Sequence, residues 1–176
     1  MKTYFSNSNL FGLKSNIITA LLMMIASNFT LAQLNAEDSL FSEARAYLSN
    51  GYYDSAVNSL NKLIELNPNS ADAYDLLGNV YSLKGGFDKA VAMYHMCIKL
   101  DSTAISMYGN LGNAYIDAGE LDSAIAVHKF LTTKDSINSY HFIDLGDAYM
   151  KKEDITQAKN CFETAIRLNH YSSRAL

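Results

Sequence analysis

The sequence lacks a basic stripe, and this absence excludes one class of partner. The first 32 residues contain Lys2 and Lys14 and no acid, so the rest of the chain carries 12 Lys and Arg against 18 Asp and Glu, a net charge of about −6 at pH 7. Binding to nucleic acid requires lysine and arginine side chains that neutralise phosphates. The acidic body therefore predicts no nucleic-acid partner.

The sequence also lacks an apolar run of the length that a membrane span needs, which is about 20 residues. The best candidate is the ten-residue apolar core 17–26. Lys2 and Lys14 precede it and Thr30-Leu31-Ala32 follows it, an order typical of a secretory signal. We expect residues 1–32 to be this signal, cleaved after Ala32, and the protein to be periplasmic or secreted, with no stable membrane span after cleavage. An uncleaved membrane anchor is the alternative, and no cysteine follows the core to carry a lipid.

Patterns that would support catalysis or cofactor binding are missing as well. No two histidines have the i, i+4 spacing of a metal site backed by carboxylates; they are His95, His128, His141 and His170. No glycine-rich phosphate loop is present, and no serine stands in a nucleophile-elbow context. We therefore predict that the protein is not an enzyme and uses no cofactor or metal.

What the chain does contain is a repeat of 34 residues. Leu77, Leu111 and Leu145 are spaced by 34, and the same spacing separates the glycines and tyrosines that follow them, namely Gly78, Gly112, Gly146, Tyr81, Tyr115 and Tyr149. A fixed period of this size indicates one small unit stacked several times. We divide the chain into a tail at 33–36, a repeat domain at 37–172 and a tail at 173–176. The four units are residues 37–70, 71–104, 105–138 and 139–172.

Each unit predicts two helices that cross closely. Unit positions 4, 7, 8 and 11 fall on one face of the first helix, and position 20 in the second helix is alanine in every unit. Position 8 is Ala44 in unit one and glycine in the others. A glycine inside a helix costs about 1 kcal/mol relative to alanine. Its recurrence implies that the second helix must approach closely at that point.

Position 15 predicts the turn between the two helices. It is glycine in units one to three, where a positive φ can end the first helix. Unit four has Glu153 instead, so we expect a looser or differently shaped turn there. Each second helix should end near an Asn or Asp, at Asn67, Asp101, Asp135 and Asn169.

This pattern resembles the tetratricopeptide repeat (TPR). The family has an aromatic residue at position 4, Leu-Gly at 7–8, Tyr at 11, Ala at 20 and an aromatic residue at 24. Leu111-Gly-Asn-Ala-Tyr with Ala124 is a close match, and the resemblance covers roughly 136 of the 176 residues. Departures are Glu43-Ala44 in unit one and Glu153 in unit four. The resemblance implies an all-α helical solenoid of four helix-turn-helix repeats, eight helices in all, preceded by the signal peptide.

The resemblance also implies a binding site. Stacked first helices line a concave groove into which positions 2, 5, 9, 12 and 13 point, and in peptide-binding members an Asn at position 9 grips the ligand backbone. An amide can donate and accept at once. The candidate groove residues are Arg45, Asp75, Asn79, Asn113, Tyr140, Asp147 and Met150. A purely structural role for the two asparagines is the alternative.

The charge of these residues limits the kinds of partner that the groove can bind. Members that clamp a C-terminal carboxylate use basic residues nearby, whereas here Asp75 and Asp147 would repel one. With Asp38, Asp72, Leu48 and Lys151 added, the groove suits an extended peptide or partner helix of apolar and basic character.

Two further features have a structural and a functional reading. Cys97 and Cys161 lie two repeats apart, so we expect two buried apolar side chains and no intrachain bridge, with an intermolecular bridge as the alternative. His128, Thr132 and Lys134 occupy positions that are apolar in most other units. We expect a partly buried, hydrogen-bonded His128 at a tolerated weak point, with local flexibility near an interaction surface as the alternative.

We conclude from the sequence that the chain is an exported, non-catalytic protein-interaction scaffold that binds a peptide or partner segment in its groove. A second hypothesis is a structural or assembly subunit that forms a homo-oligomer, or docks, through an uncapped last helix at 155–168. A third is that the chain is the truncated sensory part of a larger receptor.

Overall fold

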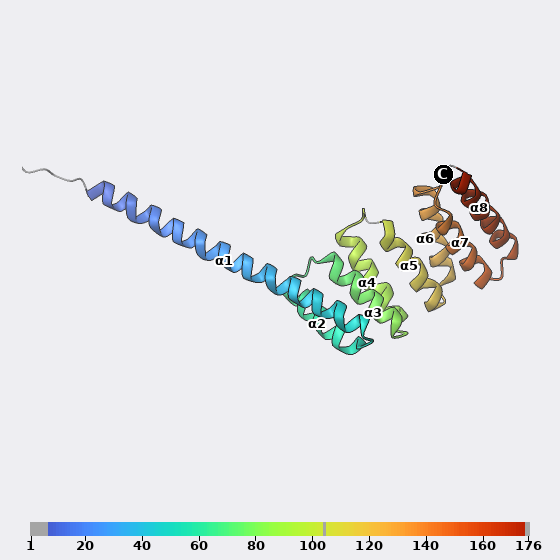
Figure 1. Cartoon of the computed structure of the whole chain (residues 1–176), viewed down its shortest axis with the longest axis horizontal. Helices are drawn as coiled ribbons and strands as arrows, with labels where there is room; N and C mark the ends of the chain where they lie inside the picture. Colours follow the sequence, from blue (N-terminus) through green and yellow to red (C-terminus); the bar gives the residue numbers. More distant parts are fainter. Residues whose placement is uncertain (1–6, 104, 175–176) are drawn as a thin grey trace, which may run out of the picture.

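The computed structural model describes residues 7–103 and 105–174, and within them the chain consists of helices joined by short turns and contains no strand (Figure 1). The described part has eight helices: α1 (Asn7–Ser49), α2 (Tyr53–Leu66), α3 (Ala71–Leu83), α4 (Phe87–Leu100), α5 (Ile105–Ala118), α6 (Leu121–Lys134), α7 (Ser139–Lys151) and α8 (Ile155–Arg174). Successive helices form antiparallel pairs that stack side by side from α1 and α2 to α7 and α8. The predicted all-α solenoid of four helix pairs is confirmed.

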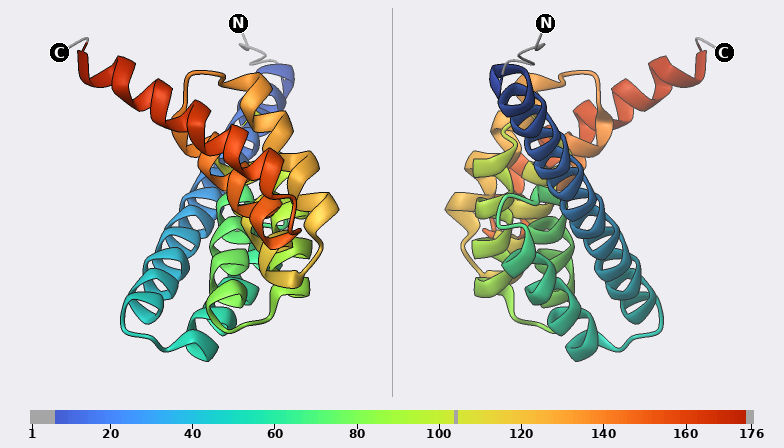
Figure 2. Two further views of the ribbon diagram at one scale, coloured as in Figure 1. Left: turned by 90° about the vertical axis from the view of Figure 1, so that its right-hand side faces the viewer. Right: turned by 90° about the vertical axis from the view of Figure 1, so that its left-hand side faces the viewer.

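The first helix is much longer than the others and extends beyond the stack (Figures 1 and 2). From Asn7 it runs without a break through the rest of the predicted signal, the predicted tail and the first helix of unit one, so no change of structure marks residue 32 or residue 36. Lys2, one of the basic residues of the predicted signal, lies outside the described residues. Four side chains of its apolar core are more than half exposed, namely Leu21, Leu22, Met23 and Met24. Gln33 Nε2 donates to Glu37 Oε1 and to the Leu66 carbonyl, each at 3.3 Å, and joins α1 to the end of α2. The cleavage point stays a prediction.

The close crossing within each pair is the main packing feature. The alanines at position 20 are fully buried, and a Cβ built on Gly78, Gly112 or Gly146 would lie 2.6, 2.5 or 2.5 Å from a ring on the second helix. Such a contact is too short for any side-chain carbon, so only glycine fits there. The expected reason for these glycines is confirmed.

The turn of unit four differs from our expectation. Glu153 has φ 65°, close to the 76°, 76° and 80° of Gly51, Gly85 and Gly119. In all four turns the amide of position 16 donates to the carbonyl of position 11, and the unit-four bond, from Asp154 N to Tyr149 O, is 3.0 Å long. The looser turn was a wrong prediction, because this shared hydrogen bond imposes one backbone conformation whatever the side chain.

The ends of the second helices follow the prediction in three units. Asn67, Asp101 and Asp135 are the C-cap residues of α2, α4 and α6. The predicted end at Asn169 is wrong, since α8 continues to Arg174. At the other three junctions the next first helix folds back beside the pair, and among the described residues α8 has no such neighbour.

Both cysteines are buried and unpaired, as predicted. Cys97 Sγ lies against Met107 Sδ, in the contact between α4 and α5. Burial raises the pKa of the Cys97 thiol to about 11, and the pKa of the Cys161 thiol is raised for the same reason. Two neutral thiols therefore act as small apolar side chains in the stack.

Candidate interaction groove

The first helices α3, α5 and α7 touch one another in sequence, so their matching faces form one continuous surface. The four residues at unit position 9 lie along the first helices. Arg45, Asn113 and Asp147 are exposed, whereas Asn79 is half-buried. The predicted residues thus differ in how far a ligand can reach them, and the contacts around each explain why.

A hollow of about 450 Å³ lies between α5 and α7. It brings together three of the predicted residues, Asn113, Asp147 and Met150, and is completed by Ile116, Asp117 and Lys151. The sequence analysis did not single out Ile116 and Asp117. They occupy positions 12 and 13 of unit three, which the resemblance aims at the groove, so the repeat register contained the signal that identifies them.

The chemistry of this hollow combines three kinds of contact. Asn113 is exposed and can both donate and accept a hydrogen bond. The carboxylates of Asp117 and Asp147 favour a cationic group, and Ile116 and Met150 provide apolar surface. Burial, together with the negative charge of Asp147, raises the pKa of the neighbouring Asp144 carboxyl, so this part of α7 already carries crowded negative charge.

Asn79 and Asp75 form a second group that is bonded internally. Tyr94 OH donates to Asn79 Oδ1 at 2.7 Å, and Asn79 Nδ2 donates to Asp75 Oδ2 at 3.4 Å. Asn110 Nδ2 donates to the other Asp75 oxygen at 3.1 Å. Burial and the charge of Asp75 raise the pKa of the Tyr94 phenol, so its hydroxyl stays a donor. Both hydrogen-bonding ends of Asn79 are therefore occupied before any ligand arrives.

Arg45 and Tyr140 lie apart from these two groups. Arg45 lines a separate hollow of about 520 Å³, with Phe41 and Leu63 as apolar walls and Glu37, Asp38 and Asp72 as acids. Tyr140 lies in the first turn of α7.

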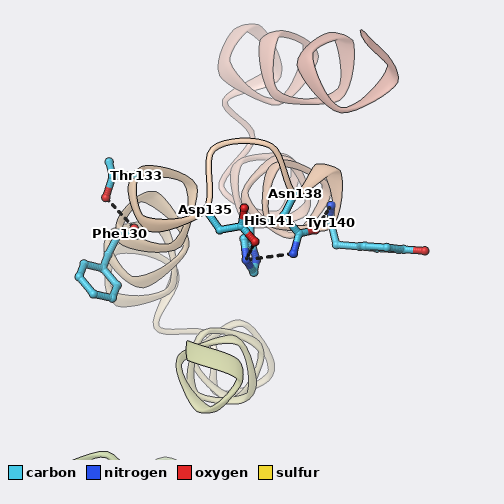
Figure 3. A network of polar contacts seen from close by, with 6 residues as sticks. All are labelled: Phe130, Thr133, Asp135, Asn138, Tyr140 and His141. Atoms are coloured by element: carbon cyan, nitrogen blue, oxygen red, sulfur yellow. Dashed lines mark hydrogen bonds and ion pairs between the residues drawn. The ribbon is translucent and has the colours of Figure 1, made fainter. Parts of the chain in front are cut away.

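The loop before α7 fixes the position of Tyr140. Asn138 Oδ1 caps the helix by accepting from the Tyr140 amide at 3.1 Å, and Asn138 Nδ2 lies 3.3 Å from His141 Nε2. Figure 3 shows the Tyr140 ring pointing away from this cluster, and 72% of the residue is exposed. The ring is accessible from solvent, although it does not line the α5–α7 hollow.

His128 differs from the expectation of a partly buried, hydrogen-bonded side chain. It is fully buried, and within the part of the chain that the structure describes neither Nδ1 nor Nε2 has a hydrogen-bond partner. The prediction was wrong because the ring fills the space left by Gly112, where neither nitrogen has a hydrogen-bond partner among the described residues. Burial lowers the pKa of His128 to about 4, and charge on His141 adds to the lowering.

Other kinds of site are absent from the part of the chain that the structure describes. There, no three His, Cys, Asp or Glu side chains gather in an arrangement that would hold a metal ion. None of the helices, over residues 7–103 and 105–174, combines the length and apolarity that crossing a membrane requires.

The repeat length and the stacked helix pairs together define a helical repeat protein. Family models described as TPR repeat or tetratricopeptide repeat match residues 44–85, 73–104, 105–127 and 142–170. The chain belongs to the tetratricopeptide repeat family, as the sequence pattern predicted. Proteins of this family act as protein-interaction scaffolds, and the fold is typically non-catalytic.

Solved structures with the same fold include MamA, at 24% identity and a TM-score of 0.73, covering 84% of this chain and 86% of that one. PilF of Pseudomonas aeruginosa matches at 26% identity and a TM-score of 0.65, covering 79% and 64%. A tetratricopeptide repeat protein of Parabacteroides merdae matches at 17% identity and a TM-score of 0.70, covering 77% and 54%. No curated protein sequence matches this chain.

Proposed function

We propose that the protein is an exported scaffold that binds an extended segment with basic and apolar side chains, seated at the hollow between α5 and α7. The observation that carries this proposal is the meeting of Asn113, Asp147 and Met150 around one hollow. Asn113 would bond the backbone of the segment. A basic side chain would lie with its stem on Met150 and its charge beside Asp147 and Asp117, because long basic side chains bury their stems and keep their charge near a partner or water.

The structure offers a matched pair of variants to test this site. Asn113→Ala removes an exposed amide, whereas Asn79→Ala removes an amide that Tyr94 and Asp75 already occupy. We would measure binding of both variants to an immobilised panel of short peptides that alternate Lys and Leu, with Glu and Leu peptides as the charge control.

We expect the Lys-Leu peptides to bind the wild-type protein and Asn113→Ala to weaken this binding about tenfold, the effect of one or two lost hydrogen bonds. Asn79→Ala should bind within about twofold of wild type. Equal binding of the Lys and Glu panels would overturn the proposed charge preference. Full binding by Asn113→Ala would place the contact elsewhere.

Export is the second part of the proposal. The basic residues before the apolar core support export. The side chains of Leu21, Leu22, Met23 and Met24 are exposed, so this end of α1 contributes nothing to the packed stack and its removal would not disturb the repeats. The intact mass of protein recovered from its native cell should correspond to a chain that begins at Gln33. A mass that includes residues 1–32 would contradict cleavage and favour the anchor.

Self-association through α8 is a second candidate function. Ile155 and Ile166 are exposed by 59% and 58%, and they lie on the helix that a further unit would cover. Position 21 argues against self-association through this helix. It is apolar in the first three units, at Val57, Val91 and Ile125. In unit four it is Lys159, which forms an ion pair with Glu163 at 3.7 Å and makes this face of α8 more polar. Light scattering at two protein concentrations tests it, since a single monomer mass at both would exclude it.

A further inference from the structure

The residue at unit position 24 occupies the same place in three repeats. The Tyr94, His128 and Phe162 rings lie over Gly78, Gly112 and Gly146, and a Cβ on each glycine would be 2.6, 2.5 and 2.5 Å away from the ring. Each ring belongs to the second helix of its unit. It packs against the first helix at position 8, the residue that precedes position 9. In unit one the same place is filled by Leu60 and Ala44, both fully buried.

Only one of these side chains carries a group that extends past the ring. The Tyr94 hydroxyl reaches Asn79 Oδ1 at 2.7 Å, and Asn79 is half-buried. His128 ends at its imidazole, both nitrogens lack a partner, and Asn113 is exposed. Phe162 and Leu60 have no polar group, and the position-9 residues of their units, Asp147 and Arg45, are exposed. Position 9 is therefore half-buried in the one unit with tyrosine at position 24 and exposed in the other three. In unit two Asn79 also donates to Asp75, whereas unit three has Gly109 in place of that carboxylate.

We propose that the residue at position 24 determines which position-9 side chains are available to a ligand. Tyr94 donates a hydrogen bond to Asn79 Oδ1, whereas His128 makes no hydrogen bond to Asn113, whose amide can therefore bond a ligand. The effect on a ligand rests on the proposed groove function, whereas the hydrogen bond itself does not. His128 and Tyr94 would then be positioning residues, because they act on the ligand only through the asparagine at position 9 of the first helix.

Two substitutions exchange the states of the two asparagines. His128→Tyr places a hydroxyl where Tyr94 has one and should engage Asn113, and Tyr94→Phe removes the hydroxyl and should release Asn79 Oδ1. His128→Phe is the matched control, because it replaces the imidazole with a ring that fits over Gly146 and adds no hydroxyl. Comparison of His128→Tyr with His128→Phe separates the hydroxyl from any general effect of filling this space.

The first measurement needs no ligand. Nitrogen-15 NMR of the full chain reports the side-chain amide of each asparagine, and hydrogen bonding of the carboxamide shifts its resonance and slows its rotation. We expect the Asn113 signal of His128→Tyr to move toward the wild-type Asn79 position, and the His128→Phe signal to stay in place. An unchanged Asn113 signal in His128→Tyr would overturn the proposal.

The second measurement uses the Lys-Leu peptide that binds the wild-type protein most tightly. His128→Tyr should weaken binding about tenfold, as expected for the loss of one well-placed hydrogen bond, and His128→Phe should bind within about twofold of wild type. Equal affinity of the two variants, with the Asn113 signal shifted, would overturn control of the ligand by position 24. If no peptide binds the wild-type protein, the proposed groove function fails. The amide signals then still decide whether the side chain at position 24 forms a hydrogen bond to the asparagine at position 9.

Discussion

Replacement of His128 by phenylalanine tests the packing account most severely, because it should make the protein more stable. The imidazole is fully buried without a hydrogen-bond partner. Phe162 shows that a phenyl ring fits the same place in the next unit, over Gly146. A buried polar group without a partner costs about 1–3 kcal/mol. We therefore expect His128→Phe to raise the free energy of unfolding by about 1–3 kcal/mol at neutral pH.

The pH dependence of the free energy of unfolding provides a second quantity to test. The pKa of His128 is lowered from its ordinary 6.5 to about 4 by burial, with charge on His141 as the smaller cause. Between these values the unfolded chain binds more protons than the folded one, so the stability of the wild-type protein rises with pH across this window. At 1.36 kcal/mol per pKa unit, His128 should remove about 2 kcal/mol between pH 7.5 and pH 5. His128→Phe should lack this part of the loss.

Urea unfolding followed by far-UV circular dichroism at the two pH values measures both effects. The advantage of His128→Phe should grow from about 1–3 kcal/mol at pH 7.5 by about 2 kcal/mol more at pH 5. Carboxylates elsewhere titrate in both proteins, so they cancel in the difference. An advantage that stays constant with pH would refute the buried, neutral histidine, and a destabilised variant at both pH values would refute the packing itself.

Other predictions concern the crossing and the turn. Gly146→Ala should lower the free energy of unfolding by about 1–3 kcal/mol, because its Cβ would lie 2.5 Å from the Phe162 ring, and overpacking of a core costs this much. Gly109→Ala is the control in chemical denaturation: its Cβ would meet nothing within 4 Å, so the variant should be unchanged or up to about 1 kcal/mol more stable. Glu153→Gly should raise the melting temperature, because a non-glycine residue at φ 65° costs about 1–2 kcal/mol; no increase would show that the side chain adds a compensating contact.

The sequence was sufficient for the repeat register because the fold depends on small residues at fixed positions. Glycine at position 8 and alanine at position 20 mark the helix crossing directly, and the structure places these residues in contact range of their neighbours. Two local predictions about the backbone were wrong for different physical reasons. The hydrogen bond from the amide of position 16 to the carbonyl of position 11 sets the conformation of Glu153. The last helix continues to Arg174, and among the described residues no further first helix packs beside it.

The site was harder to predict, because availability depends on contacts between helices. Asn79 and Asn113 are identical in type and register, yet Asn79 is half-buried and bonded to Tyr94 and Asp75, whereas Asn113 is exposed. The sequence shows that position 24 of the second helix is a tyrosine, but it does not show that the Tyr94 hydroxyl points to Asn79 on the first helix. In the same way, Ile116 and Asp117 become part of one hollow only when α5 and α7 lie side by side.

The central claim is that a partner segment binds at the α5–α7 hollow. The most direct test is an NMR titration of the full chain with the Lys-Leu peptide that binds most tightly. We predict that the largest changes fall on the Asn113 side-chain amide and the Met150 methyl group, and that the Asn79 amide changes little. Saturable changes confined to the exposed face of α8, around Ile155 and Ile166, would contradict the claim and favour assembly through the last helix.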